Sequence, residues 1–267
     1  MPYVDIDNEL RMHYEDDDFS PPWEDSEVIL MHHGNAKNSK FWYGWIPVLS
    51  SKYRVIRVDG RGFGQSTVPS EGYKWSLEQF ANDSKNLLDE LGISKVHFIG
   101  ETIGGSIGLV FAHMFPDMTQ SLTLCTSPYN FAAVKTYSEY RDLVLQKGVR
   151  TWVELTSSQR LPADRTKHNA WYIDQMSNTS KQVVVETLSY LSRVDLTPIL
   201  PEIKTPTLIL VGGQSLMNTD GRVRSLQQLL VNSAIKELEG ASGYVQHSEP
   251  AMCAEAWLDF ASEIVNN

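Results

Sequence analysis

The sequence is poor in cysteine, and its 267 residues include only two, Cys125 and Cys253. Two cysteines do not make the disulfide framework of a small secreted domain, which favours a reducing compartment. No apolar run approaches the roughly 20 residues of a membrane-spanning helix. The first residues do not show the basic and then apolar pattern of a secretory signal peptide. We therefore expect a soluble, cytoplasmic protein.

Basic residues are also scarce, because 23 lysines and arginines stand against 33 aspartates and glutamates, for a net charge of -10. This balance argues against nucleic acid or an anionic membrane as a partner. The sequence has no His-x-x-x-His or Cys-x-x-Cys spacing for a metal, and no Gly-x-Gly-x-x-Gly motif follows its first strand. We expect no metal, no cofactor and a small molecule as the ligand, while the oligomeric state stays open.

Short apolar runs alternate with helical patterns along most of the chain. The spacing predicts a hairpin at 3–14, a helix after Ser76 and strands at 27–32, 53–59, 97–100, 122–126, 207–211 and 235–238. Strands that alternate with helices indicate a parallel sheet with crossover helices. The alternation stops between 129 and 197, where the pattern is helical and rich in Tyr and Trp. We predict an α/β core of residues 1–128 and 198–267, with a helical cap inserted at 129–197.

Three local patterns give further predictions. The acidic, proline-containing run at 15–24 is expected to be a solvated loop. Ser76, with Gln79 three residues on, has the form of a capping box at a helix N-terminus. Asp59 and Arg61, in a glycine-rich stretch after a predicted strand, are expected to form a structural ion pair.

The stretch from His97 to Gly105 begins as an apolar strand and continues into a helix with almost no loop. Gly100 and Gly104 crowd the turn, and a reversal this tight needs residues without a Cβ atom. The pattern Gly-x-Nu-x-Gly is that of a nucleophile elbow, whose central residue stands at the tip of a strained turn. The central residue here is Thr102, where serine is usual.

Three other motifs accompany the elbow, namely His33-Gly34-Asn35, a glycine-rich run from Asp59 to Ser66, and an apolar run from Pro206 to Gly212. In this order and spacing, the chain resembles α/β-hydrolase fold proteins with one helical cap, such as enol-lactonases, esterases and C–C hydrolases. The resemblance covers essentially the whole chain. It implies a mostly parallel sheet flanked by helices, and a catalytic triad in the order nucleophile, acid, histidine.

The resemblance places a degenerate triad on this chain. Thr102 stands at the nucleophile position, where it either attacks a carbonyl or only fills the turn, because its β-branched methyl restricts the side chain. The acid position falls on Ser215. The next carboxylate is Asp220, which either reaches the site or caps the following helix. The histidine position is Gly243, and His247, four residues later, is either a displaced base or a histidine at the surface or against the cap.

An oxyanion hole uses backbone N–H groups and therefore tolerates side-chain changes. The resemblance points to Asn35 and to Ile103, which begins a helix whose dipole adds favourable potential. Glu101 is expected to point away from the cleft, and Lys37 either to be solvated or to reach an anionic substrate. The candidates for substrate contact are His33, Tyr129, Trp171, Tyr172 and Tyr244. Structural roles are the alternatives for three of them, under the loop for His33 and in helix packing for Trp171 and Tyr172.

Three functions fit these residues. The first is an enzyme acting on an ester, lactone or related carbonyl compound, with Thr102 as nucleophile and His247 or water as base. The second is a non-hydrolytic lyase, isomerase or cyclase that stabilises an enolate in the oxyanion hole. The third is a small-molecule-binding pseudoenzyme. A Thr102 hydroxyl within about 3.2 Å of an imidazole nitrogen would favour the first, and the aromatic-rich cap favours a largely apolar ligand in all three.

Overall fold

The computed structural model describes residues 2–239, 241 and 243–265. Within them, one sheet of eight strands runs in the order β1-β2-β4-β3-β5-β6-β7-β8. The strands are β1 (Tyr3–Asp5), β2 (Arg11–Asp17), β3 (Val28–His32), β4 (Arg54–Val58), β5 (Val96–Glu101), β6 (Thr119–Cys125), β7 (Thr207–Gly212) and β8 (Ser233–Leu238). β2 pairs antiparallel with β1 and β4, and the other neighbours are parallel. The predicted α/β class and mostly parallel sheet are confirmed.

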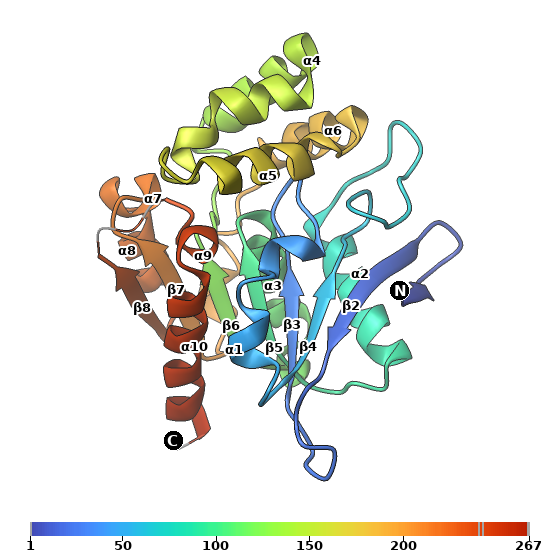
Figure 1. Cartoon of the computed structure of the whole chain (residues 1–267), viewed down its shortest axis with the longest axis vertical. Helices are drawn as coiled ribbons and strands as arrows, with labels where there is room; N and C mark the ends of the chain where they lie inside the picture. Colours follow the sequence, from blue (N-terminus) through green and yellow to red (C-terminus); the bar gives the residue numbers. More distant parts are fainter. Residues whose placement is uncertain (1, 240, 242, 266–267) are drawn as a thin grey trace.

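Helices cover both faces of the sheet (Figure 1). They are α1 (Ile46–Leu49), α2 (Leu77–Glu90), α3 (Ile103–Met114), α4 (Thr136–Leu155), α5 (Thr166–Ser177), α6 (Lys181–Leu191), α7 (Leu216–Thr219), α8 (Arg222–Leu229), α9 (Val245–Ser248) and α10 (Pro250–Val265), with 3₁₀ turns η1 (Ser39–Trp42), η2 (Pro116–Met118), η3 (Ser157–Gln159) and η4 (Leu200–Glu202). None of the helices in the described residues is long and apolar enough to cross a membrane.

The sheet is buried on both faces because helices pack on each of them, and successive strand residues point alternately to the two sides. Leu30 and Phe98 pack with α2, α3 and α8 in one apolar cluster. Their neighbours Ile29 and Ile99 pack with α1 and α10 in the other cluster. Every residue of β5 and of β7 is therefore buried, which is why these strands appear in the sequence as continuous apolar runs.

The segment 129–197 forms a helical layer of α4, α5 and α6 above the carboxyl ends of the parallel strands (Figure 1). Its apolar cluster includes Trp152 and extends down to Phe41. An isolated bridge between Asn130 and Asp195 joins the places where the chain leaves the sheet and returns to it. The division into a core and a cap domain with these boundaries stays a prediction.

Ser76 caps α2, since its Oγ accepts a hydrogen bond from the Gln79 N–H at 3.0 Å. The Gln79 side chain donates to Asp83 at 2.9 Å instead of turning back, so only half of the expected capping box forms. We expect Ser76→Ala to lower the free energy of unfolding by about 1 kcal/mol, measured by urea denaturation. Ser70→Ala, in the exposed loop before the helix, is the control and should change little. Equal effects of the two substitutions would contradict the capping role.

The prediction of a loop over 15–24 is wrong for its first residues. Residues 15–17 belong to β2 and pair with β4. Their acidic side chains are partly neutralised across the strands, where Asp16 binds Arg54 at 2.8 Å and Asp17 binds Arg57 at 2.7 Å. These ion pairs join two strands that are far apart in sequence, so the acidic run did not reveal them.

The predicted ion pair between Asp59 and Arg61 is also wrong. Arg61 binds Asp83 in a bidentate pair, with N–O distances of 2.9 and 2.7 Å. Asp59 accepts a hydrogen bond from the Ser39 N–H at 2.6 Å and lies 2.9 Å from His13 Nδ1. The two side chains thus connect the glycine-rich stretch to different elements. Arg61 binds α2, and Asp59 binds β2 and η1.

Candidate functional site

The elbow has a strained backbone at Thr102, with φ 48° and ψ -117°. A positive φ is uncommon for a β-branched residue. It arises because β5 ends at Glu101 and α3 begins at Ile103, so one residue makes the whole reversal. A Cβ on Gly104 would lie 2.2 Å from the His32 carbonyl oxygen. The glycine lets the helix lie this close to the neighbouring strand, and the elbow thereby presents Thr102 at the carboxyl edge of the sheet.

Thr102 lines a cavity of about 160 Å³ beneath the helical layer. Asn35 and Ile103 line the same cavity on the side of the sheet, and residues of α4 and α6 line it from above. Ile103 is the first residue of α3, so its N–H has no intrahelical partner. Within the described residues, neither the Asn35 nor the Ile103 N–H donates to a protein acceptor. Both backbone donors are available to a bound oxygen, while their assignment as an oxyanion hole stays a prediction.

The other two triad positions of the resemblance lie at this cavity as well. Ser215 and Gly243 both line it, and a Cβ on Gly243 would stand 3.9 Å from the Ser215 Cα. The same Cβ would lie only 2.8 Å from the carbonyl oxygen of Gln159. Neither position carries an acid or an imidazole. Gly240 and Ser242, in the run that leads to Gly243, fall outside the described residues.

Asp220 and His247 lie in different surroundings from those of a triad. Asp220 is exposed and binds Arg222 at 2.7 Å. His247 is buried and not at the surface, and its ring packs against Tyr172 of α5, which is the expected contact with the helical layer. Its Nε2 lies 2.6 Å from Glu101 Oε2. The Thr102 hydroxyl makes no hydrogen bond to His247 or to any other described residue, and the contact that would favour a threonine–histidine pair is not formed.

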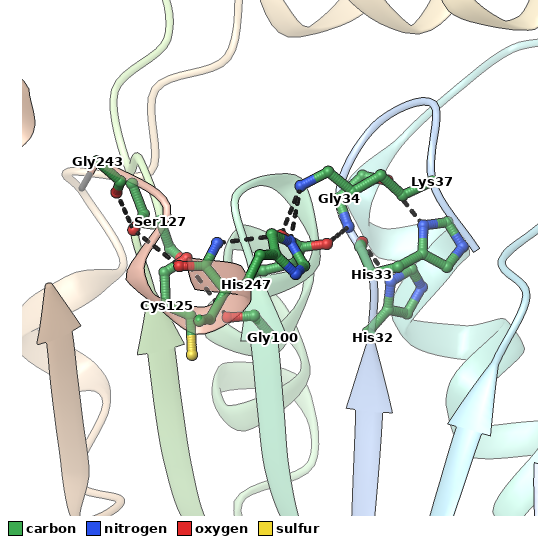
Figure 2. A network of polar contacts seen from close by, with 12 residues as sticks. His32, His33, Gly34, Lys37, Gly100, Cys125, Ser127, Gly243 and His247 are labelled. Atoms are coloured by element: carbon green, nitrogen blue, oxygen red, sulfur yellow. Dashed lines mark hydrogen bonds and ion pairs between the residues drawn. The ribbon is translucent and has the colours of Figure 1, made fainter. Parts of the chain in front are cut away.

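A buried polar cluster lies directly behind the elbow and centres on Glu101. Its Oε1 accepts the Gly34 N–H at 3.0 Å. Its Oε2 lies 2.6 Å from Lys37 Nζ, 2.6 Å from His247 Nε2 and 3.1 Å from Gln246 Nε2. Figure 2 shows Lys37 extending from the Gly34 loop towards His247. Lys37 is only 2% exposed, so the expectation of a solvated lysine is wrong.

The hydrogen bonds of this cluster assign its protons. A carboxylate only accepts, so His247 Nε2 carries the hydrogen and donates it to Glu101. Lys37 Nζ, 3.1 Å from the same nitrogen, therefore donates to Glu101 and only contacts the imidazole. The cluster holds one carboxylate, one ammonium and one neutral imidazole.

Burial and charge set the pKa values in this cluster. Burial lowers the pKa of Lys37 to about 8, although Glu101 opposes the shift. Burial alone would raise the pKa of Glu101, but His247 and Lys37 hold it well below its ordinary value. Burial also lowers the pKa of His247, with Lys37 acting in the same direction and Glu101 against it. Lys37 is the group of the three whose proton is released near neutral pH.

Of the three aromatic candidates Tyr244, Tyr172 and Trp171, only Tyr244 is part of the described cavity lining. Tyr244 lines the cavity, and its ring centre lies 4.7 Å from Lys37 Nζ. Tyr172 is buried behind the cavity against His247, with ring centres 5.5 Å apart, and its hydroxyl has no partner among the described residues. Trp171 lines a separate surface groove.

The remaining candidates for substrate contact, His33 and Tyr129, form hydrogen bonds that hold the backbone in place. His33 is buried, and its ring lies between the Gly34 carbonyl at 2.7 Å and the Gly60 N–H at 2.9 Å. Its ring fixes the loop that carries Asn35. The Tyr129 carbonyl accepts the Leu196 N–H of the returning chain at 2.8 Å, and this tyrosine is not part of the described cavity lining.

Sequence reasoning did not place Lys37 and Glu101 together at the candidate site. The signal that could have indicated it is the presence of one lysine just after the His-Gly-Asn motif and one glutamate before the elbow residue. In the part of the chain that the structure describes, no group of three or more His, Cys, Asp or Glu side chains could hold a metal ion.

Comparison with known proteins agrees with the geometry. A family model of the alpha/beta hydrolase fold matches residues 27–250. A relative in Stutzerimonas stutzeri, named "Putative carbamate hydrolase RutD", is 29% identical over 90% of this chain and 93% of its own length. Epoxide hydrolase 4 of Mus musculus is 34% identical over 48% of this chain and 34% of its own length.

Solved structures show the same fold. The enol-lactonase from Burkholderia xenovorans LB400 superposes with a TM-score of 0.87 at 24% identity, covering 98% of this chain and 100% of its own. Est816, described as an N-acyl homoserine lactone degrading enzyme, superposes with a TM-score of 0.84 at 19% identity, covering 97% of this chain and 100% of its own. At these identities the likeness extends to the fold alone. With its sheet order, its elbow and the family model that spans most of its length, this chain belongs to the α/β-hydrolase fold family.

Proposed function

We propose that this protein is an enzyme that acts on a small, largely apolar carbonyl compound, such as an ester or lactone, in the cavity between core and cap. One observation carries the proposal. Thr102 and Lys37 line the same cavity as Asn35 and Ile103, whose backbone N–H groups have no acceptor among the described residues. Such a cavity offers a nucleophile, a proton carrier and an oxyanion site, which are the parts that acyl transfer needs.

The backbone N–H groups of Asn35 and Ile103 act on the substrate carbonyl. They polarise it and stabilise the negative oxygen that forms when the carbonyl carbon is attacked. The N-terminal end of α3 adds positive potential at the same place. The side chain of Asn35 donates to Thr187 Oγ1 of α6 at 3.2 Å, which connects this loop to the cap.

Lys37 replaces the histidine as the proton carrier. With a pKa of about 8, about one lysine in ten is a neutral amine at pH 7, which is enough for a general base. The Thr102 hydroxyl attacks the carbonyl carbon and gives its proton to this amine. The leaving alkoxide takes the proton from the ammonium, and water then hydrolyses the acyl-threonine by the same route. Glu101 orients the amine throughout.

A non-hydrolytic reaction is the second candidate, because the Thr102 hydroxyl has no hydrogen bond to a base among the described residues. In that reaction the oxyanion hole stabilises an enolate while Lys37 removes or returns a proton. A lyase, isomerase or cyclase would work in this way, without a covalent intermediate. The relatives are named for carbamate, epoxide and lactone hydrolysis, and these three substrate classes do not decide between the two candidates.

The test compares two variants across p-nitrophenyl esters, γ- and δ-lactones and 1,3-dicarbonyl compounds. If Thr102 is the nucleophile, Thr102→Ala and Lys37→Met should each lower kcat/KM on an ester or lactone by about 100-fold or more. The wild-type kcat/KM should rise with pH around an apparent pKa near 8, the value for Lys37. Lys40→Met, which removes an exposed lysine of η1, is the matched control and should leave kcat/KM unchanged.

Other results with these two variants would favour one of the alternative functions. Loss of activity in Lys37→Met with less than tenfold loss in Thr102→Ala would favour the non-covalent reaction. Mass spectrometry of the protein after brief exposure to an activated ester checks this directly, since acylation at Thr102 appears only in the covalent mechanism. No turnover of any of these compounds would count against an enzyme and favour a binding protein.

A further inference from the structure

We infer that Lys37 forms a protonated Schiff base with a small aldehyde or ketone in the cavity, where the Glu101 carboxylate and three aromatic rings stabilise the product. The product is an iminium ion, in which the lysine nitrogen is joined to the carbonyl carbon of the ligand. This covalent binding goes beyond the proposed action on an ester or lactone, since it needs neither the Thr102 hydroxyl nor a leaving alkoxide.

Lys37 is the member of the buried polar cluster that reaches the cavity. It lines the cavity, whereas Glu101 and His247 are not part of the described lining. Its Nζ lies 4.7 Å from the ring centre of Tyr244, which is another lining residue. Among the described residues of the lining, Lys37 is the one lysine. A primary amine therefore stands at the cavity in which the proposed oxyanion hole would bind a carbonyl oxygen.

The hydrogen bonds of Lys37 leave part of its ammonium without an acceptor. An ammonium has three N–H donors. Within the described residues its one acceptor is Glu101 Oε2, 2.6 Å away, because the His247 Nε2 at 3.1 Å carries a hydrogen of its own. Buried donors without a partner are unfavourable, and most are paired in folded proteins. A protonated Schiff base has a single N–H, for which the Glu101 oxygen is sufficient.

The surroundings of the Lys37 nitrogen favour a cation both before and after the reaction. The ring centres of Phe41, Tyr172 and Tyr244 lie 5.6, 5.4 and 4.7 Å from Nζ. The negative faces of aromatic rings attract a cation at these distances, and the Glu101 carboxylate supplies the counter-charge. An iminium carries the same single positive charge as an ammonium. The ion pair is therefore kept, and no additional charge is buried.

The reaction begins with the neutral amine. Burial lowers the pKa of Lys37 to about 8, so about one lysine in ten has lost its proton at pH 7. The nitrogen lone pair attacks the carbonyl carbon, and the π electrons of the C=O bond move to the oxygen, which the oxyanion hole would stabilise. A proton passes from the nitrogen to this oxygen and gives a carbinolamine. The hydroxyl then takes up a proton and leaves as water while the C=N bond forms, so that overall an ammonium and a carbonyl give an iminium and water.

The test traps the iminium with sodium cyanoborohydride at pH 7 and locates it by peptide mass spectrometry. With propanal as the probe, reduction leaves a stable propyl group on the lysine. We expect Lys37 to be labelled at least tenfold faster than Lys40, an exposed lysine of η1 that is the internal control. The physical reason is that a lysine in water, with a pKa of about 10.4, is neutral in only about one molecule in 2,500 at pH 7. Lys37→Met should lose the rapid labelling, and Lys40→Met should keep it.

A larger aldehyde tests whether the ligand reaches Lys37 through the cavity. The cavity of about 160 Å³ is close in size to the cavity of roughly 150 Å³ that holds benzene in another protein. Propanal therefore fits, and 1-pyrenecarboxaldehyde does not. The larger aldehyde should label Lys40 and leave Lys37 unlabelled.

Labelling of Lys37 by propanal that is no faster than labelling of Lys40 would overturn the inference. Equal labelling of Lys37 by the two aldehydes would contradict its placement in the cavity. Both comparisons are made within the wild-type protein, so they do not depend on how well a variant folds. Turnover of esters without labelling of Lys37 would contradict the Schiff base alone, whereas labelling of Lys37 in a protein inactive on esters would support the Schiff base and count against the proposed function.

Discussion

Replacement of Glu101 with glutamine should lower the free energy of unfolding by about 3–5 kcal/mol, the usual result of leaving a buried charge without its partner. Glutamine keeps an oxygen for the Gly34 N–H, but it has no charge to balance the Lys37 ammonium 2.6 Å away. Its amide hydrogens would also face the N–H donors of Gln246 and His247. Urea denaturation at pH 7 measures the loss. Glu90→Gln, an exposed substitution at the end of α2, is the matched control.

The pH dependence of this loss identifies its cause. Below a pH of about 8, Lys37 is mainly protonated in the wild type and depends on Glu101 for its counter-charge. Above that pH the amine is neutral, so the difference between Glu101→Gln and the wild type should be smaller at pH 9 than at pH 6. The double variant Glu101→Gln with Lys37→Met should recover more than about 1 kcal/mol relative to additivity. A pH-independent loss and additive effects would show that the ion pair contributes nothing of its own.

Gly104→Ala should prevent the elbow from closing and lower the free energy of unfolding by about 4 kcal/mol or more, which is at the upper end for a single substitution. The added methyl would stand 2.2 Å from the His32 carbonyl oxygen and 2.6 Å from that of His33. Both are backbone atoms, one in the last residue of β3 and one in the residue that follows it, so no side-chain rotation relieves the collision. We expect little soluble protein at 37 °C, and a greatly reduced urea midpoint for any that folds.

Substitutions at two other glycines test whether the loss at Gly104 comes from a steric collision or from an unfavourable backbone conformation. Gly92 has φ +69°, but a Cβ added there would meet no atom within 4 Å, so Gly92→Ala should lose only about 1 kcal/mol. A Cβ on Gly105 would meet the side chain of Ser127, which can be removed. Gly105→Ala should therefore be partly rescued by Ser127→Gly, whereas no side-chain replacement should rescue Gly104→Ala. A Gly104→Ala protein as stable as Gly92→Ala would contradict the close approach of α3 to β3.

Local sequence patterns determined most of the fold. Continuous apolar runs predicted β3, β5 and β7, because strands buried on both faces need apolar residues throughout. Gly100 and Gly104 predicted the elbow, because a collision between a Cβ and nearby backbone depends on residues a few positions apart. The family resemblance also placed two triad positions, at Ser215 and Gly243, and a degenerate triad there stays a prediction.

The chemistry of the site was decided by the tertiary structure alone. Lys37 and Glu101 are 64 residues apart, and Glu101 and His247 are 146 residues apart. Nothing in the local pattern of any of the three indicated that they would be buried together. Burial lowers the pKa of Lys37, which is the reason for proposing it as the proton carrier, and burial depends on three distant segments that pack against one another. The sequence thus predicted where the candidate site lies, and the packing of the whole chain decided which of its charged groups are buried, because desolvation is a property of the assembled environment and not of the residue.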